Sequence, residues 1–136
     1  GWGYLSHRVL ARKSIEEMHL IEADIDALDC ARRNVLDKRA LFHWEDATRW
    51  HPPAALDTVI MNPPFHTSRS PDPGLGRAFI RAAARILAPK GQLFLVANRH
   101  LAYESELARN FAEVDEMQGT SRFKLLHAAR PTRKAG

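Results

Sequence analysis

Segments with the pattern of β-strands alternate along this chain with segments patterned as α-helices, and this alternation most constrains the fold. Short apolar runs predict strands, and runs with apolar residues every three or four positions predict helices. The predicted strands are residues 19–23, 40–47, 56–61, 91–98, 112–117 and 123–130, and the predicted helices are residues 24–38, 77–91 and 103–111. The alternation holds until the last two strands, which follow one another. We therefore expect an α/β fold: a mostly parallel sheet with helices on both faces and an antiparallel C-terminal edge strand.

The length of 136 residues suits one domain with one hydrophobic core. No apolar run is long enough to span a membrane, and no signal peptide pattern is present, so we expect a cytoplasmic location without membrane contact. The single cysteine, Cys30, excludes an intramolecular disulfide and agrees with a reducing compartment. The seven histidines are scattered singly and none pairs at metal-ligand spacing, so we expect no metal.

Positive charge is concentrated in the second half of the chain. Residues 69–109 carry seven Lys and Arg against three acidic residues, and after Glu116 there are five basic residues and no acidic ones. A basic region suits a polyanion such as RNA, but solvated surface charge explains the same composition equally well. Arg122 and Lys124 are weak candidates for phosphate binding, and Phe123 between them is expected to enter the core.

Polar residues end four of the predicted strands. In sheets of this type, ligands bind outside the carboxyl ends of the strands. The residues at these ends are Glu22, Asp46, Asn62 and Asn98. We therefore expect them along one edge of the sheet, where a ligand would lie.

The first of these strand ends suggests a nucleotide site. Gly1 and Gly3 resemble the second half of a glycine-rich turn, in which the backbone can come close to a nucleotide. Glu22 follows about 20 residues later, a spacing at which a carboxylate typically accepts hydrogen bonds from ribose hydroxyls. Asp46 would accept from an adenine amino group, and the Ala47 backbone N–H would donate to a ring nitrogen. An adenosine would then lie along this edge.

Asn62, Pro63, Pro64 and Phe65 interrupt the most hydrophobic predicted strand at its end. Two prolines stop a strand because neither has an N–H for the ladder. The run resembles the [N/D]-P-P-[F/Y/W] signature of class I S-adenosylmethionine-dependent methyltransferases that act on exocyclic or amide nitrogens. The runs NPPFH, VANRHLAYESEL and FKLLHAAR resemble the catalytic domain of the ribosomal RNA guanine-N2 methyltransferases, the family of small-subunit methyltransferase C and large-subunit methyltransferase G.

This resemblance covers essentially the whole chain. It implies a Rossmann-like class I methyltransferase sheet, S-adenosyl-L-methionine as cofactor, and ribosomal RNA or a ribosomal subunit as partner. The implied reaction transfers a methyl group to the exocyclic N2 amine of a guanine. The Asn62 side-chain carbonyl and the Pro63 backbone carbonyl would each accept one amino hydrogen, and the rings of Pro63 and Pro64 would hold these acceptors in place. Phe65 would stack on a flipped base, unless the run is a structural turn carrying a core aromatic ring.

Four further residues are candidates for binding the RNA: His66, Arg69, Arg99 and Tyr103. His66 would contact the base or a phosphate, or accept a proton after transfer. Arg69 lies in a polar loop after the Asn62 run and would contact phosphates, or else be an ordinary surface residue. Arg99 and Tyr103 follow the predicted strand 91–98, where they would bind RNA by charge and stacking or hold the Asn62 turn by hydrogen bonds.

The family pattern begins with a strand followed by D/E-x-G-x-G-x-G, and this chain begins at the second glycine of that run or later. The family also carries a second, N-terminal methyltransferase-like domain. We therefore expect residues 1–136 to form a single, N-terminally truncated methyltransferase domain without its first strand. We also expect this truncated domain to bind the cofactor weakly or not at all.

Two other functions remain open. An enzyme acting on adenine N6 or on a protein glutamine would share the same Asn-Pro-Pro chemistry, but the VANRHL run and the basic half favour RNA guanine. A non-catalytic RNA-binding module would need no cofactor site. The presence of Glu22, Asp46 and Asn62 together argues against that second alternative.

Overall fold

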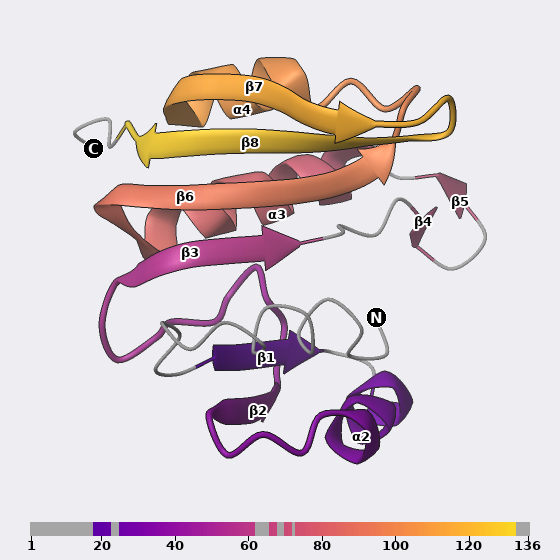
Figure 1. The fold of residues 1–136 in the computed structure, drawn as a ribbon, viewed down its shortest axis with the longest axis vertical. Coiled ribbons are helices and arrows are strands. Elements are labelled where there is room, and N and C mark those ends of the chain that lie inside the picture. The colour runs from indigo at the N-terminus through magenta and orange to yellow at the C-terminus, as the bar shows by residue number, and fades with distance from the viewer. Residues whose placement is uncertain (1–17, 23–24, 62–65, 68–69, 72, 133–136) are drawn as a thin grey trace. The chain divides into compact units, whose positions relative to one another are not determined.

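The structure is a computed structural model that describes residues 18–22, 25–61, 66–67, 70–71 and 73–132. It divides the chain into two compact units, residues 1–50 and residues 51–136. Each unit has its own sheet (Figure 1). In the part of the chain that is described, no helix is long and apolar enough to cross a membrane.

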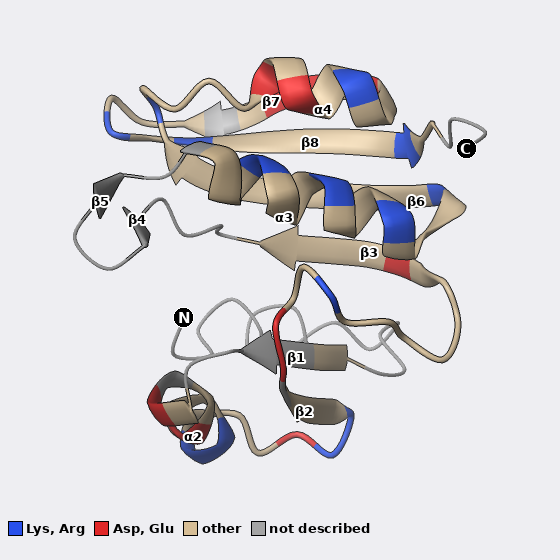
Figure 2. Cartoon of the chain, turned by 180° about the vertical axis from the view of Figure 1, so that it is seen from behind, with Lys and Arg blue, Asp and Glu red and all other residues tan. Residues whose placement is uncertain are grey.

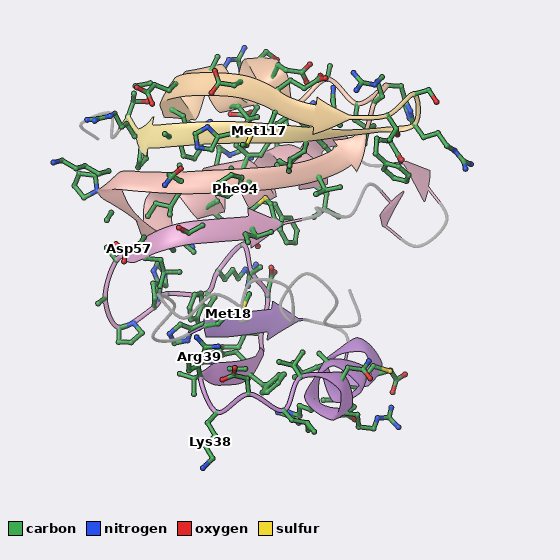
Figure 3. The ribbon with its side chains drawn as sticks, in the orientation of Figure 1. Met18, Lys38, Arg39, Asp57, Phe94 and Met117 are labelled. Carbon is green, nitrogen blue, oxygen red and sulfur yellow. The ribbon has the colours of Figure 1, made fainter. Side chains whose placement is uncertain are left out.

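Unit 1 contains a parallel strand pair connected through a helix. Strand β1 (Met18–Glu22) pairs with β2 (Ala40–Trp44), and helix α2 (Ile25–Asn34) lies between them in sequence. The helix has an acidic residue in its first turn and basic residues in its last, an arrangement that suits the helix dipole. In the turn before β2, Arg39 donates hydrogen bonds to Asp37 while Lys38 points away from the chain (Figure 3).

Unit 2 contains a four-stranded sheet in the order β3-β6-β8-β7. Its strands are β3 (Leu56–Met61), β6 (Leu87–Asn98), β7 (Phe111–Gly119) and β8 (Phe123–Pro131). The β3–β6 pair is parallel, whereas β8 runs antiparallel to both β6 and β7. Two short strands, β4 (His66–Thr67) and β5 (Ser70–Pro71), form a small separate hairpin. The sheet confirms the predicted parallel strands followed by antiparallel pairing at the C-terminal end, although the antiparallel strand β8 lies between β6 and the edge strand β7.

Helices α3 (Pro73–Ile86) and α4 (Glu104–Asn110) lie on the same face of this sheet. They are behind the strands in Figure 1 and in front of them in Figure 2, which shows the opposite side. Alternate residues of β6 and β8 point toward the helices and are buried. Together with side chains of α3 and α4 they form the core: Ile80, Ala83, Leu87, Leu93, Leu95, Ala97, Leu107, Leu126 and Ala128.

Helix α3 begins earlier than the sequence pattern predicts. The predicted helix begins at Arg77, but α3 begins at Pro73, inside a stretch that the glycines and prolines had marked as a loop. Proline is favourable at the first helical position because its fixed φ suits a helix and its missing N–H would be unbonded there. Helix α3 therefore has four more residues at its start than the pattern predicts.

Strand β6 also begins earlier than predicted, at Leu87 rather than Gly91. The register along β3 shifts between Leu56, which pairs with Leu87, and Thr58, which pairs with Gln92. The extra residues of β6 bulge here, and a Cβ at Gly91 would lie 2.9 Å from the Ala88 carbonyl oxygen. Glycine therefore allows the irregular start of this strand.

Candidate functional site

The predicted site residues fall into three groups. Seven lie outside the described residues: Gly1, Gly3, Asn62, Pro63, Pro64, Phe65 and Arg69. Glu22 and His66 are placed by their backbones, at the last residue of β1 and the first residue of β4. Asp46, Ala47, Arg99 and Tyr103 are described with their side chains.

Glu22 and Asp46 reach the same edge of the sheet in unit 1. Glu22 ends β1 and pairs with Trp44, which ends the parallel strand β2. Asp46 follows Trp44 by two residues. The structure thus brings these two acidic positions together at the carboxyl ends of parallel strands, where ligands of such sheets bind.

The Asp46 carboxylate is fixed by the turn that follows it. Its Oδ1 accepts hydrogen bonds from the Thr48 hydroxyl at 2.7 Å and the Thr48 backbone N–H at 2.9 Å. These two bonds, the hydroxyl first, hold the pKa of Asp46 below its usual value, so the group stays ionised. Neither its Oδ2 nor the Ala47 N–H hydrogen-bonds to a described residue. An acceptor and a donor are therefore adjacent and available to a ligand.

Three aromatic rings support this turn, and no pattern in the sequence predicts this contact. His19 Nδ1 lies 2.9 Å from His43 Nε2, and Trp50 packs against both rings at 5.2 Å between centroids. Trp50 is only 6% exposed. Burial, followed by the nearby His19, lowers the pKa of His43, while Glu45 opposes this shift. The contact joins two strands to the residue that ends the Asp46 turn, and only the strand register reveals it.

In unit 2, the strand that precedes Asn62 lies beside β6. Met61 ends β3 opposite Leu95, and β6 continues three residues further to Asn98. Asn98 in turn pairs with Phe123, the first residue of β8. The chain therefore leaves β3 at the sheet edge where β6 ends and β8 begins.

Arg99 holds the hairpin between β7 and β8. Its Nε donates to the Thr120 carbonyl at 2.6 Å, and its two terminal nitrogens each lie 3.2 Å from an oxygen of Glu116. Its backbone N–H donates to the Arg122 carbonyl at 2.9 Å. A Cβ at Gly119 would meet the guanidinium, which would then have to shift. The charge of Arg99 is thus balanced within the hairpin, and its predicted contact with RNA remains a prediction.

Tyr103 lies in the core rather than on the surface. Its ring is 3% exposed and packs against Gly76 of α3, where a Cβ would overlap the hydroxyl. The hydroxyl makes no hydrogen bond with a described residue, and burial raises its pKa against the opposing charge of Arg77. This burial corrects the expectation that Tyr103 stacks on RNA: in this structure the ring packs α3 against the residues before α4.

Phe123 and Lys124 exchange the environments that the sequence analysis assigned to them. Phe123 was expected in the core but is 48% exposed, whereas Lys124 is 4% exposed and its Nζ lies 2.8 Å from Glu104. The strand register explains the exchange, because Lys124 pairs with buried Ala97 on the helix-covered face and Phe123 pairs with exposed Asn98. A hollow of about 430 Å³ borders Phe123, lined by Val96, Gly119, Thr120, Phe123, Lys124 and Leu125.

Among the described residues, no group of three or more His, Cys, Asp or Glu side chains is placed to hold a metal ion. The polar groups described at the ends of these strands include hydrogen-bonding groups and the ionised carboxylate of Asp46. They suit the binding of a nucleoside by hydrogen bonds.

The profile of one known family, the methyltransferase small domain, matches residues 1–127. The chain belongs to the methyltransferase small domain family. Two of its curated relatives modify ribosomal RNA by name. Ribosomal RNA small subunit methyltransferase C of Hahella chejuensis is 41% identical over 75 residues, covering 55% of this chain and 22% of the relative. Ribosomal RNA large subunit methyltransferase G of Pseudomonas putida is 33% identical over 116 residues, covering 82% of this chain and 31% of the relative.

Solved structures agree with this assignment. The Thermus thermophilus 16S rRNA N2 G1207 methyltransferase RsmC, in complex with AdoMet and guanosine, is 26% identical with a TM-score of 0.68. The matched region covers 84% of this chain and 31% of the RsmC chain. The N-methyltransferase NodS from Bradyrhizobium japonicum, with S-adenosyl-L-homocysteine, has a TM-score of 0.75 at 15% identity, over 96% of this chain and 74% of that one. This methyltransferase small domain therefore has the predicted class I methyltransferase fold, and it spans less than a third of the rRNA methyltransferases that it matches.

Proposed function

We propose that this chain is the catalytic part of an enzyme that transfers a methyl group from S-adenosyl-L-methionine to the exocyclic N2 amine of a guanine in ribosomal RNA. The observation that carries this proposal is the likeness to the RsmC structure, whose ligands are AdoMet and guanosine. The likeness extends over most of the chain at 26% identity. Such an enzyme would work in the cytoplasm on RNA or a ribosomal subunit.

The cofactor site of this proposal is built on unit 1. The Asp46 Oδ2 would accept from the adenine amino group, and the adjacent Ala47 N–H would donate to a ring nitrogen. Glu22, at the end of the neighbouring strand, would accept from the ribose hydroxyls. The available donor and acceptor at Asp46 and Ala47 support this assignment, with Gly1 and Gly3 as the proposed turn beneath the methionine part.

The catalytic site follows β3 in unit 2. The bound cofactor supplies an activated methyl group, and the residues of the chain hold the amine that receives it. The carbonyls of Asn62 and Pro63 would accept the two amino hydrogens, directing the nitrogen lone pair toward the methyl group. Phe65 would stack on the guanine. The methylated nitrogen then loses one proton, for which His66 is the proposed acceptor.

A row of arginines on α3 supports a polyanionic substrate. Arg77, Arg81 and Arg85 are exposed at intervals of four residues, which places them on one side of the helix (Figure 2). The helix contains no acidic residue, and like charges at this spacing destabilise a helix slightly. Arg81 is paired with Glu106 of α4 at 3.3 Å. A row of arginines that slightly destabilises its own helix suits a surface that binds RNA phosphates.

Replacing Asn62 by Ala in the full-length enzyme that contains this chain tests the proposal. The variant keeps the fold of the strand but lacks one acceptor for the amine, so methyl transfer to unmodified ribosomal RNA should be abolished. Its affinity for the same RNA should stay close to that of the wild type, because phosphate contacts supply most of the binding. Transfer at the wild-type rate by this variant would exclude the proposed catalytic role of Asn62.

A further inference from the structure

Phe123 is an exposed aromatic side chain at the edge of the sheet in unit 2. Among the described residues, five large apolar side chains are exposed, and Phe123 is the aromatic one. It borders the hollow of about 430 Å³, whose other apolar walls are Val96 and Leu125. Exposure of an apolar ring gives up the free energy that its burial would contribute. The ring is therefore available to pack against a flat apolar ligand.

The hairpin that carries Phe123 is held by several hydrogen bonds. The Thr120 N–H donates to the Phe123 carbonyl at 2.8 Å, and the Thr120 hydroxyl accepts from the backbone N–H groups of Arg122 and Phe123, both at 3.1 Å. Arg99 adds its bond to the Thr120 carbonyl at 2.6 Å. A ligand that binds to the ring therefore has little backbone to order, which lowers the cost of binding.

Of the charged side chains at this hairpin, Arg122 is the one available to an anion. Arg99 is paired with Glu116, and Lys124 is buried against Glu104. Arg122 is exposed and forms no ion pair with a described residue. Arg122 and Phe123 are consecutive residues of the turn, so this turn offers a cation without an ion pair to a described residue and an exposed aromatic ring. These two groups fit the two parts of a nucleotide, the phosphate and the base.

The hairpin lies near the position where β3 ends. Phe123 pairs with Asn98, three residues beyond Leu95, which pairs with Met61. Three residues along a strand and two strands across the sheet place Phe123 roughly 14 Å from Met61. Asn62 follows Met61 in the chain, so a base on Phe123 would belong to a nucleotide close to the target in the same single strand.

We propose that Phe123 and Arg122 form a second nucleotide-binding site, in which an unpaired base of the RNA stacks on Phe123 and its phosphate contacts Arg122. The inference rests on the proposed RNA methyltransferase function and adds a contact outside the catalytic residues. Stacking does not depend on the identity of the base, so this site would position the RNA while the guanine-specific contacts are made elsewhere.

The binding of a short fluorescein-labelled oligoriboadenylate, followed by fluorescence anisotropy, tests the site. Phe123→Ala should weaken binding about 5- to 100-fold, and Phe123→Trp should preserve it. An oligomer of the same length without bases should bind the wild type and Phe123→Ala equally, because the lost interaction is with the base. In methyl transfer, Phe123→Ala should raise KM for ribosomal RNA and leave kcat and cofactor affinity unchanged.

Met117→Ala is the matched control. Met117 is a similarly exposed apolar residue of β7 (Figure 3), but it does not line the hollow, so its loss should not change RNA affinity. If the wild type methylates RNA, and Phe123→Ala has the same KM and the same RNA affinity, the inference is overturned and the proposed function stays intact. If Phe123→Ala binds RNA more weakly but the wild type transfers no methyl group, the inference about Phe123 is supported and the proposed function is excluded. A wild type that fails to bind the oligomer, or a dimer that Phe123→Ala dissociates, would also overturn the inference.

Discussion

Arg99 and Glu116 form a two-point ion pair, with each terminal guanidinium nitrogen 3.2 Å from a carboxylate oxygen. Arg99 follows β6 and Glu116 belongs to β7, which is two strands away in the sheet. The pair therefore connects the end of β6 to the hairpin that carries Phe123. Both side chains are partly exposed, so water weakens the attraction between their charges. The pair stabilises the hairpin mainly through its two-point hydrogen-bonding geometry.

Arg99→Lys should loosen this hairpin. Lysine cannot form the two-point contact with Glu116 while also donating to the Thr120 carbonyl. The Thr120 amide, which donates to Phe123, should exchange its hydrogen about three to ten times faster, as followed by mass spectrometry. Arg130→Lys is the control, because Arg130 lies 3.9 Å from Glu113 and holds no turn. Equal exchange in wild type and Arg99→Lys would show that the hairpin is ordered without Arg99.

Thr48→Val should raise the pKa of Asp46 toward its ordinary value. The Thr48 hydroxyl is the largest cause of the low pKa, and valine removes it while keeping the shape. Because the folded pKa lies below the unfolded one, the contribution of Asp46 to stability is complete above the unfolded pKa. It is lost as the pH falls through the folded pKa. In Thr48→Val the folded pKa lies closer to the unfolded one, so the loss of stability on acidification should be smaller and should be complete at a higher pH than in the wild type.

An NMR titration of the Asp46 carboxyl carbon in both proteins measures the change directly. The carboxyl group of Glu45 is a suitable internal reference, because Thr48 donates its hydrogen bonds to Asp46 and not to Glu45. If Asp46 titrates at the same pH in both proteins, the bonds from Thr48 do not stabilise its ionised form.

Glu104→Gln should destabilise the protein more than Lys124→Met. Lys124 is 4% exposed, and removal of its partner would leave a buried ammonium without a balancing charge. Because Glu104 is half exposed and water can approach, the expected cost is about 1–3 kcal/mol, below that of a fully buried pair. Methionine fills the same space without charge, so Lys124→Met should change the free energy of unfolding little. Urea denaturation measures the free energy of unfolding of both variants. A lower value for Lys124→Met than for Glu104→Gln would contradict this prediction.

Replacing Arg77, Arg81 and Arg85 together by Gln should reduce the salt dependence of RNA binding. Each phosphate contact to single-stranded RNA contributes about 0.7 to the slope of log K against log salt concentration, so three contacts contribute about 2. The matched control replaces Arg32, Arg33 and Lys38, three exposed basic residues of unit 1, by Gln. A slope that falls equally in both triple variants would assign the effect to net charge rather than to α3.

The pattern of the sequence predicted the strands that carry the site better than the surfaces around them. Residues 56–61 form β3 as predicted, because an apolar run bounded by prolines leaves little choice of ends. Glu22 and Asp46 come to one sheet edge for a similar reason, since Glu22 ends β1 and Asp46 follows the end of the parallel strand β2 by two residues. The start of α3 at Pro73 was not predicted, because proline and glycine are typical of loops and also begin helices.

The errors concern side chains whose environment depends on strand register. Phe123 and Lys124 are adjacent, so one faces the helices and the other does not, and only the pairing with Asn98 and Ala97 decides which. Composition predicts the reverse, because phenylalanine is more often buried than lysine. Tyr103 enters the core because Gly76 of α3 leaves room for its ring, a contact between segments that are distant in sequence.

The most direct test of the central claim identifies the product nucleoside. Unmodified ribosomal RNA is incubated with the full-length enzyme that contains this chain and with S-adenosyl-L-methionine. The RNA is then digested with nuclease, and its methylated nucleosides are identified by mass spectrometry against standards. We expect N2-methylguanosine in the reaction with the wild-type enzyme. Methylated adenosine, or no methylated nucleoside above that of the RNA alone, would contradict it.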